Sequence, residues 1–93
     1  MAFSIDVIAS FNPGGEVKPL YFRVENPDGL QMTFAVDHVL NRKEEVVWGV
    51  LCYHYVCEVT SPDDPLPKTI DLYYHIDSHR WMTGAGNADS LFA

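Results

Sequence analysis

The sequence predicts an all-β domain, a small antiparallel barrel or rolled sheet of five or six strands that is SH3-like or OB-like. Apolar residues recur at every second position in several segments, as they do in half-buried strands. Clusters of Pro, Gly, Asn and Asp separate these segments, and no stretch of a dozen residues has a helical period. Because one small open sheet would leave an apolar face in water, we expect the strands to close on themselves.

Length and charge restrict the function classes. A chain of 93 residues has room for one core, and we expect a single β domain over residues 1–82 followed by a flexible tail over residues 83–93. The formal net charge is −7, and the six basic residues are scattered along the sequence. Such a chain repels nucleic-acid phosphates, so the composition disfavours nucleic-acid binding.

Two strands are expected in the first 25 residues. From Ile5 to Phe11 the odd positions are apolar, and the Asn12–Gly15 segment that follows concentrates four turn formers. Pro19 indicates an edge position in the second strand, since proline cannot donate to a neighbour. The alternation over residues 17–25 predicts inward-facing Leu20, Phe22 and Val24, and outward-facing Tyr21 and Arg23.

The segment Asn26-Pro27-Asp28-Gly29 predicts a tight hairpin turn. Its residue types fit a type I turn closed by Gly29 in the left-handed region, which places Asn26 opposite Leu30. Counting outward from this turn pairs apolar residues with apolar residues at each step: Val24 with Met32, Phe22 with Phe34, and Leu20 with Val36.

The middle of the chain changes character at Val46. The polar segment Asp37–Glu45 predicts either a long loop or a single helical turn. Val46–Thr60 is the longest apolar run, and we expect one long strand bent at Gly49. In its second half the expected inward residues are Leu51, Tyr53, Tyr55, Cys57 and Val59, and the outward ones Cys52, His54 and Glu58.

The last third of the chain contains a loop and two strands. Three prolines in Ser61–Pro67 predict a loop, and Arg80–Met82 is expected to form a last short strand after a turn at Asp77–His79. Thr69–Asp77 alternates again, with Ile70, Leu72, Tyr74 and Ile76 expected inside and Asp71, Tyr73, His75 and Asp77 outside.

Four short strings, VIASFNPGGEVKPLYFRVE, VDHVL, YHYVCEV and IDLYYHIDSHRWM, resemble a group of short uncharacterised bacterial proteins. The resemblance extends to Trp81 and implies an all-β fold without an established activity. The acidic Asp63–Asp64 pair and the residues after Met82 do not match that pattern. The positions that carry the resemblance are Ala9, Gly15, Pro19, Leu20, Arg23, Val36, Val39, Tyr55, Cys57, Leu72, Tyr73 and Trp81.

One group of residues could ligate a metal. If Thr60 pairs with Thr69, four potential ligands meet on the outer face of the last long hairpin, with His54 opposite His75 and Cys52 opposite Asp77. The same register places Glu58 opposite Asp71, a like-charge pair that disfavours it, and the chain lacks a C-x-x-C spacing. We therefore expect no metal and no cofactor, and keep these four residues as the alternative.

The sequence predicts no enzyme. Cys52 and His54 are the only thiol and base that share a strand face, but no sharp turn or helix N-terminus activates the thiol. Cys57 has the pattern of a small core residue between Tyr55 and Val59. The adjacent acids in the loops are expected to form a solvated surface.

Aromatic residues on faces that should be polar predict a binding surface. Tyr21 with Arg23, Tyr73 with His75, and the tryptophans Trp48 and Trp81 are the candidates. We expect a non-enzymatic interaction module for a protein partner or for a second copy of the chain. The alternatives are a single-strand nucleic-acid binder and an accessory protein for a metal or small molecule. Two unpaired cysteines and the lack of a secretory signal predict a cytoplasmic location.

Overall fold

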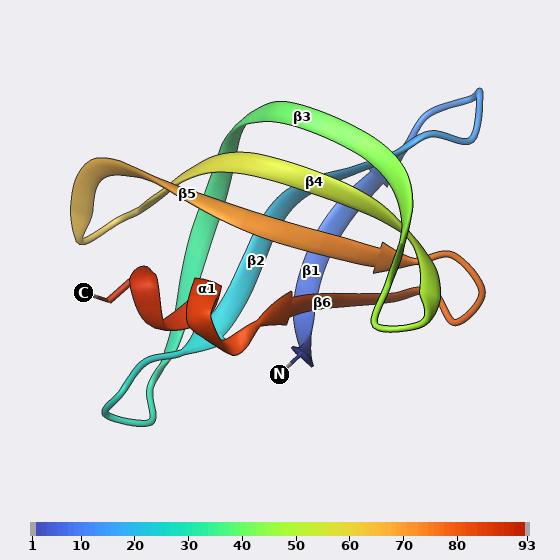
Figure 1. The fold of residues 1–93 in the computed structure, drawn as a ribbon. Coiled ribbons are helices and arrows are strands. Elements are labelled where there is room, and N and C mark those ends of the chain that lie inside the picture. Colours follow the sequence, from blue (N-terminus) through green and yellow to red (C-terminus); the bar gives the residue numbers. More distant parts are fainter. Residues whose placement is uncertain (1, 93) are drawn as a thin grey trace.

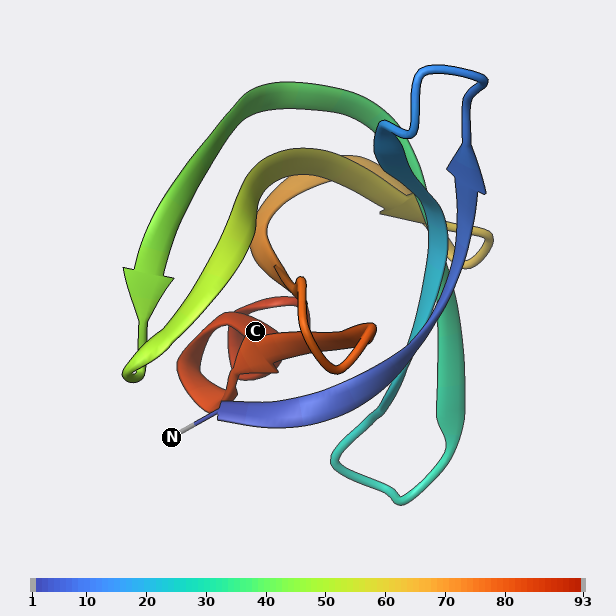
Figure 2. The same ribbon diagram turned by 90° about the vertical axis from the view of Figure 1, so that its right-hand side faces the viewer.

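The computed structural model describes residues 2–92 and confirms the small all-β barrel (Figure 1). Six antiparallel strands pair in chain order, and β6 pairs with β1 to close the ring (Figure 2). This is an up-and-down meander, whereas an OB-like barrel has a Greek-key order. The elements are β1 (Ala2–Phe11), β2 (Val17–Glu25), β3 (Gln31–Val47), β4 (Val50–Ser61), β5 (Asp64–His75), β6 (Arg80–Gly84) and the short helix α1 (Ala85–Ser90).

The core fills the barrel with side chains from alternate positions of its strands. Phe22 and Phe34 stack with ring centroids 5.3 Å apart, and Trp81 packs at 5.0 Å against Tyr74 and at 5.4 Å against Tyr55. The inward faces expected for residues 17–25 and 69–77 are confirmed in most positions, since Phe22, Val24, Ile70, Leu72 and Tyr74 are buried. Leu51, expected inside, is exposed near the start of β4, and Phe11, one of the apolar odd positions of β1, is exposed at the end of its strand.

The β2–β3 hairpin has the predicted turn. Gly29 adopts φ +83°, and the Asn26 N–H donates to the Leu30 carbonyl. The pairs of Val24 with Met32 and of Phe22 with Phe34 are confirmed. The expected pair of Leu20 with Val36 is not formed: the ladder ends at Tyr21 and Ala35, where β3 turns from β2 towards β4.

Pro19 does not mark an edge of the whole sheet, because β2 lies between β1 and β3 in a closed barrel. It pairs with Ala9 at a β-bulge, where Ile8 pairs with Tyr21 and Leu20 is the extra residue. The β3 ladder begins only at Tyr21. A proline is tolerated here because no strand pairs with this part of β2 on its β3 side.

Residues 37–60 differ from the prediction. The expected polar loop over 37–45 belongs to β3, and the expected single strand over 46–60 is divided by a hairpin turn. Trp48 and Gly49 form this turn with φ of +51° and +77°. Positive φ at both central residues is the geometry of a type I′ turn. The sequence does not predict this turn, because it lies within an apolar run and because tryptophan rarely adopts a positive φ.

The proline-rich loop is shorter than expected. Only Pro62 and Asp63 separate β4 from β5, and Pro65 and Pro67 lie within β5. Pairing between β5 and β6 covers only Tyr73–His75, so the proline part of β5 has β4 as its single neighbour in the ladder. Pro65 and Pro67, which have no backbone N–H, are therefore tolerated, because one side of this part of β5 has no strand to which an N–H could donate.

Residues 83–92 do not form the flexible tail that the sequence predicts. Thr83 is fully buried in β6 and donates its hydroxyl to the Asp71 carbonyl. After α1, Leu91 is 3% exposed within the core cluster. The Phe92 ring lies 5.9 Å from that of Phe34, edge to face. The last residues thus add to the barrel core rather than extending from it.

Candidate functional site

The six predicted binding residues fall into three places. Tyr21 and Arg23 lie on the outer face of β2, where both are exposed. A second place, around the β3–β4 turn and the end of β5, contains Tyr73, His75 and Trp48. β5 is not a neighbour of β2 in the barrel. Trp81 is 7% exposed in the core, so it contributes packing and very little accessible surface.

Tyr21 is the centre of an outward row that crosses four strands. Ile8 pairs with Tyr21 across β1 and β2, Tyr21 with Ala35, and Ala35 with Thr60. Directly opposed residues on one sheet face are in contact range, so these four side chains form a continuous strip. Ile8 is 65% exposed and Tyr21 47% exposed. We call these residues the Tyr21 row.

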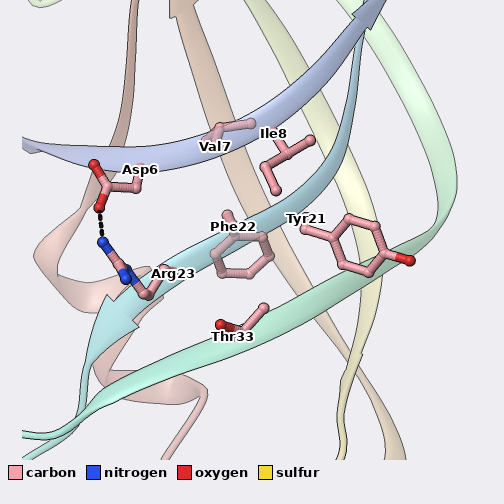
Figure 3. A pocket seen from close by; sticks show the side chains of 7 residues that line it. All are labelled: Asp6, Val7, Ile8, Tyr21, Phe22, Arg23 and Thr33. Carbon is pink, nitrogen blue, oxygen red and sulfur yellow. Dashed lines mark hydrogen bonds and ion pairs between the residues drawn. The ribbon is translucent and has the colours of Figure 1, made fainter.

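Two depressions adjoin the Tyr21 row, and Tyr21 and Thr33 line both of them. The first has a volume of about 300 Å³, and in Figure 3 Ile8 and Tyr21 lie at one end of it and the Asp6–Arg23 pair at the other. Its lining residues are Asp6, Val7, Ile8, Tyr21, Phe22, Arg23 and Thr33. The second, on the β3–β4 side, has a volume of about 250 Å³ and is lined by Tyr21, Thr33, Ala35, Thr60, Ser61 and Pro62.

An ion pair frames the first depression. The Arg23 guanidinium donates to the Asp6 carboxylate, which lies opposite it across the β1–β2 ladder. Both side chains are more than half exposed, so the pair contributes little to stability. Its effect is to hold the long Arg23 side chain along the sheet and to leave the depression without net charge.

A second group of side chains lies on the outer face of β3, β4 and β5. The His54 ring lies between two carboxylates: Nδ1 contacts Glu45 Oε1, and Nε2 lies 3.0 Å from Asp71 Oδ1. Tyr73 stacks on His54 at 4.5 Å, and Trp48 meets Tyr73 edge to face at 4.8 Å. We call these five residues the His54 cluster.

The β4–β5 register explains why this cluster differs from the predicted metal set. Cys52 pairs with His75, and His54 pairs with Tyr73, which is two residues away from the predicted register. The predicted opposition of Glu58 to Asp71 is likewise wrong, because Glu58 pairs with Thr69. The loop length was overestimated, since β5 begins at Asp64 rather than after Pro67.

The four proposed metal ligands do not converge. Both nitrogens of His54 contact carboxylates, His75 Nδ1 lies 3.2 Å from Ser78 Oγ, and Asp77 is exposed in the β5–β6 turn. Cys52 lies opposite Glu45 on the outer face, as expected, but it is fully buried there. Within residues 2–92 no group of three or more His, Cys, Asp and Glu side chains has an arrangement that could hold a metal ion.

Neither cysteine is arranged as a nucleophile. Burial raises the pKa of Cys52, and the nearby Glu45 carboxylate raises it further. Burial raises the pKa of Cys57 to about 12, with a smaller effect from Asp71. Both thiols are free and buried. Because the reactive species is the thiolate, these environments make both sulfurs poor nucleophiles near neutral pH.

Sequence reasoning missed three members of these surfaces. Ile8 is an apolar residue at an even position of β1, so it breaks the alternation of that strand, and this break places an apolar residue on the outer face. Glu45 fell within the expected loop, and its contact with His54 depends on the Trp48–Gly49 turn. Asp71 was correctly expected outside, but its contact with His54 depends on the β4–β5 register.

Comparisons with known proteins supply no relative: no family model, no curated protein and no solved structure matches the chain. The resemblance to short bacterial all-β proteins therefore stays a prediction. Among residues 2–92, no helix has the length and apolar character that crossing a membrane requires.

Proposed function

We propose that this chain is a non-enzymatic interaction module that binds a protein partner through the Tyr21 row. The observation that carries the proposal is the half-exposed Tyr21 ring, which stands between two depressions with exposed Ile8 beside it. An apolar side chain of an extended partner segment fits each depression, and the Tyr21 hydroxyl, which has no hydrogen-bond partner within residues 2–92, can hydrogen-bond to the partner at the rim. Tyr and Arg are enriched among the residues that dominate binding energy at protein interfaces.

The charge distribution supports a protein ligand over a single nucleic-acid strand. Nucleic-acid grooves need several unpaired cations along the backbone path. Among the residues that line the two depressions, the one cation is Arg23, and it is paired with Asp6. The whole chain carries a net charge of −7. A neutral, partly aromatic surface suits a protein segment better than a phosphate backbone.

The thiol environments support a binding role over catalysis. Cys52 beside His54 was the one nucleophile–base pair that the sequence offered, and the pKa of Cys52 is raised by burial. His54 itself contacts Glu45 and Asp71 through both ring nitrogens, so its ring is engaged in surface contacts rather than directed at the thiol. Two free cysteines also support the cytoplasmic location that we propose, where thiols stay reduced.

Site-specific photo-cross-linking tests the Tyr21 row. A benzoylphenylalanine at Thr33, which lines both depressions, should give discrete protein adducts in a lysate of cells that express the chain. Excess unlabelled wild type should suppress these adducts by competition. The Tyr21→Ser variant should fail to compete, while Leu66→Ser, at a more exposed apolar position on β5, should compete like the wild type.

Two results would overturn the proposal. One is equal competition by Tyr21→Ser and the wild type, which would mean that the adducts do not depend on the Tyr21 row. The other is binding of a fluorescent single-stranded oligonucleotide with a steep salt dependence, which would place the nucleic-acid alternative first. That titration uses the same purified proteins.

A further inference from the structure

The second half of β3 has a neighbouring strand on one side only. β3 pairs with β2 over Gln31–Ala35 and with β4 over Ala35–Val47. Figure 2 shows β3 leaving β2 and curving across the barrel to the β3–β4 turn, with β4 alone beside it. A strand with one neighbour presents a row of unpaired N–H and C=O groups on its other side.

The facing part of β2 is protected, whereas this part of β3 is not. Pro19 has no N–H to offer, and the Val17 carbonyl accepts a hydrogen bond from the Tyr55 hydroxyl. β3 has bulges between Val36 and His38 and between Val39 and Asn41. From Asn41 to Val47, however, its register with β4 is regular. This segment, which we call the β3 edge, is therefore suited to pair with another strand.

The turn at Trp48–Gly49 determines which backbone groups of the β3 edge are free. A two-residue turn closes on a hydrogen-bonded pair, here Val47 with Val50. Hydrogen bonding alternates along an antiparallel strand, so Glu45 and Lys43 also direct their backbone groups to β4. Val46, Glu44 and Arg42 then direct theirs to the unpartnered side.

We propose that a second copy of this chain pairs antiparallel with the β3 edge about a two-fold axis at Lys43. In that register Arg42 lies opposite Glu44 of the second copy, and the symmetry forms this opposite-charge pair twice. The backbone groups of both residues are directed towards the new ladder, and the Arg42 N–H, which donates to Asn41 Oδ1 in one chain, exchanges that contact for a ladder hydrogen bond. Beyond them, Val46 comes beside Leu40 of the second copy, and these apolar side chains are 68% and 56% exposed in one chain.

Charge complementarity favours a second copy over another strand. The β3 edge contains two bases followed by two acids, Arg42-Lys43-Glu44-Glu45. A uniformly acidic segment would place a like charge beside Glu44, and a uniformly basic segment would place a like charge beside Arg42. An identical strand in the reverse direction offers each charge its opposite at the two flanking pairs. The two Lys43 side chains meet at the axis, where the Glu45 carboxylate, 3.3 Å from Nζ in each chain, offsets their repulsion.

Charge reversal tests this register through the oligomeric state. Sedimentation equilibrium of the wild type should show a monomer–dimer equilibrium that weakens with added salt. Arg42→Glu alone and Glu44→Arg alone should each be monomeric, because each places like charges opposite each other twice. An equimolar mixture of the two should dimerise again, since Glu at 42 then faces Arg at 44 in one pair and the native Glu44 faces the native Arg42 in the other. Asp63→Arg, an exposed charge reversal in the β4–β5 turn, should dimerise like the wild type.

The Arg42 guanidinium lies 4.2 Å from the centre of the Tyr53 ring, so Arg42→Glu also removes a contact within the chain. A variant that changes the backbone of the β3 edge provides an independent test. Glu44→Pro removes one outward N–H and should abolish the dimer while keeping the wild-type circular dichroism spectrum. A wild type that stays monomeric at millimolar concentration would overturn the proposal. So would a dimer that both Glu44 variants retain. Tyr21→Ser should still dimerise, and Glu44→Arg should still compete in the cross-linking assay, so failure here is distinguishable from failure of the Tyr21 row.

Discussion

His54 joins three strands on the outer face, because its Nε2 lies 3.0 Å from Asp71 Oδ1 of β5 while its Nδ1 contacts Glu45 of β3. A neutral imidazole has one N–H and can donate to only one of the two carboxylates, whereas an imidazolium donates to both. The side chain is 14% exposed, and Tyr73 covers one ring face. The contact holds the β3–β4 hairpin against β5 at the end where the barrel opens.

This contact predicts an acid-sensitive contribution to stability. The pKa of Glu45 is lowered from its usual 4.5: burial is the largest single effect and raises it, but the hydrogen bonds and the charges of His54 and Lys43 together outweigh burial. A carboxyl group with a lower pKa in the folded state stabilises the fold above about pH 4.5 and loses that contribution as the pH falls through the lower value. Glu45→Gln should therefore unfold with a flatter pH dependence below pH 4.5, measured by urea titration. Glu44→Gln, on the other face of β3, should keep the wild-type profile; equal profiles for Glu45→Gln and the wild type would contradict the prediction.

Two glycine substitutions should have opposite signs. Gly29→Val places a β-branched residue at φ +83° and should destabilise the fold by about 1–2 kcal/mol or more. Gly86 lies in α1 with open space where a Cβ would be, so Gly86→Ala should stabilise by about 0.5–1 kcal/mol. Chemical denaturation of both variants measures the difference. A stabilising Gly29→Val would show that the β2–β3 turn has another conformation.

The parts of the fold that the sequence predicts are those encoded locally. The Asn26–Gly29 turn and the alternation on either side of it agree, so the β2–β3 register is correct up to Phe22 and Phe34. The Trp48–Gly49 turn was missed because its first residue has a conformation that tryptophan rarely adopts, within an unbroken apolar run. Every contact that depends on this turn, including that of Glu45 with His54, was missed with it.

The sequence predicts binding residues only where the alternation of apolar and polar positions along a strand determines which side chains are exposed. The outward positions of Tyr21 and Arg23 follow from the pattern of β2, and both are exposed. The predicted metal ligands depended on the register between β4 and β5. Three prolines suggested a long loop there, but two of them lie within β5, so the predicted register was wrong. Trp81 belongs to a strand too short for alternation to assign its face, and the face proved to be the inner one.

Truncating the two aromatic candidates should separate packing from recognition. Trp81 is 7% exposed and packs on Tyr55 and Tyr74, so Trp81→Ala should cost about 3–5 kcal/mol and impair folding. Tyr21→Ala removes a half-exposed ring and should change stability by about 0.5 kcal/mol or less. Thermal unfolding followed by circular dichroism gives both values. Comparable losses in the two variants would mean that Tyr21 also supports the fold.

Thiol labelling measures the protection of the two cysteines. Both are fully buried, and burial raises the pKa of each. Reaction with a chromogenic disulfide at pH 8 should therefore be slow in the native protein and fast after addition of guanidinium chloride. Cys52→Ala and Cys57→Ala assign the rates to single thiols. Rapid labelling of native protein at either position would show that the barrel opens there on the timescale of the assay.

The C-terminal segment should contribute to stability in spite of its composition. Leu91 is 3% exposed and lies in the core cluster, and Phe92 packs on Phe34, so the segment covers apolar surface that would otherwise meet water. Leu91→Ala should destabilise by about 2–5 kcal/mol, as do other truncations of buried leucine. Leu66→Ala, at a position 69% exposed, is the matched control and should stay within about 0.5 kcal/mol of the wild type. Urea denaturation of the two variants decides the matter. If Leu91→Ala unfolds at the wild-type midpoint, the last residues do not pack on the barrel in solution, and the tail is flexible as its composition predicted.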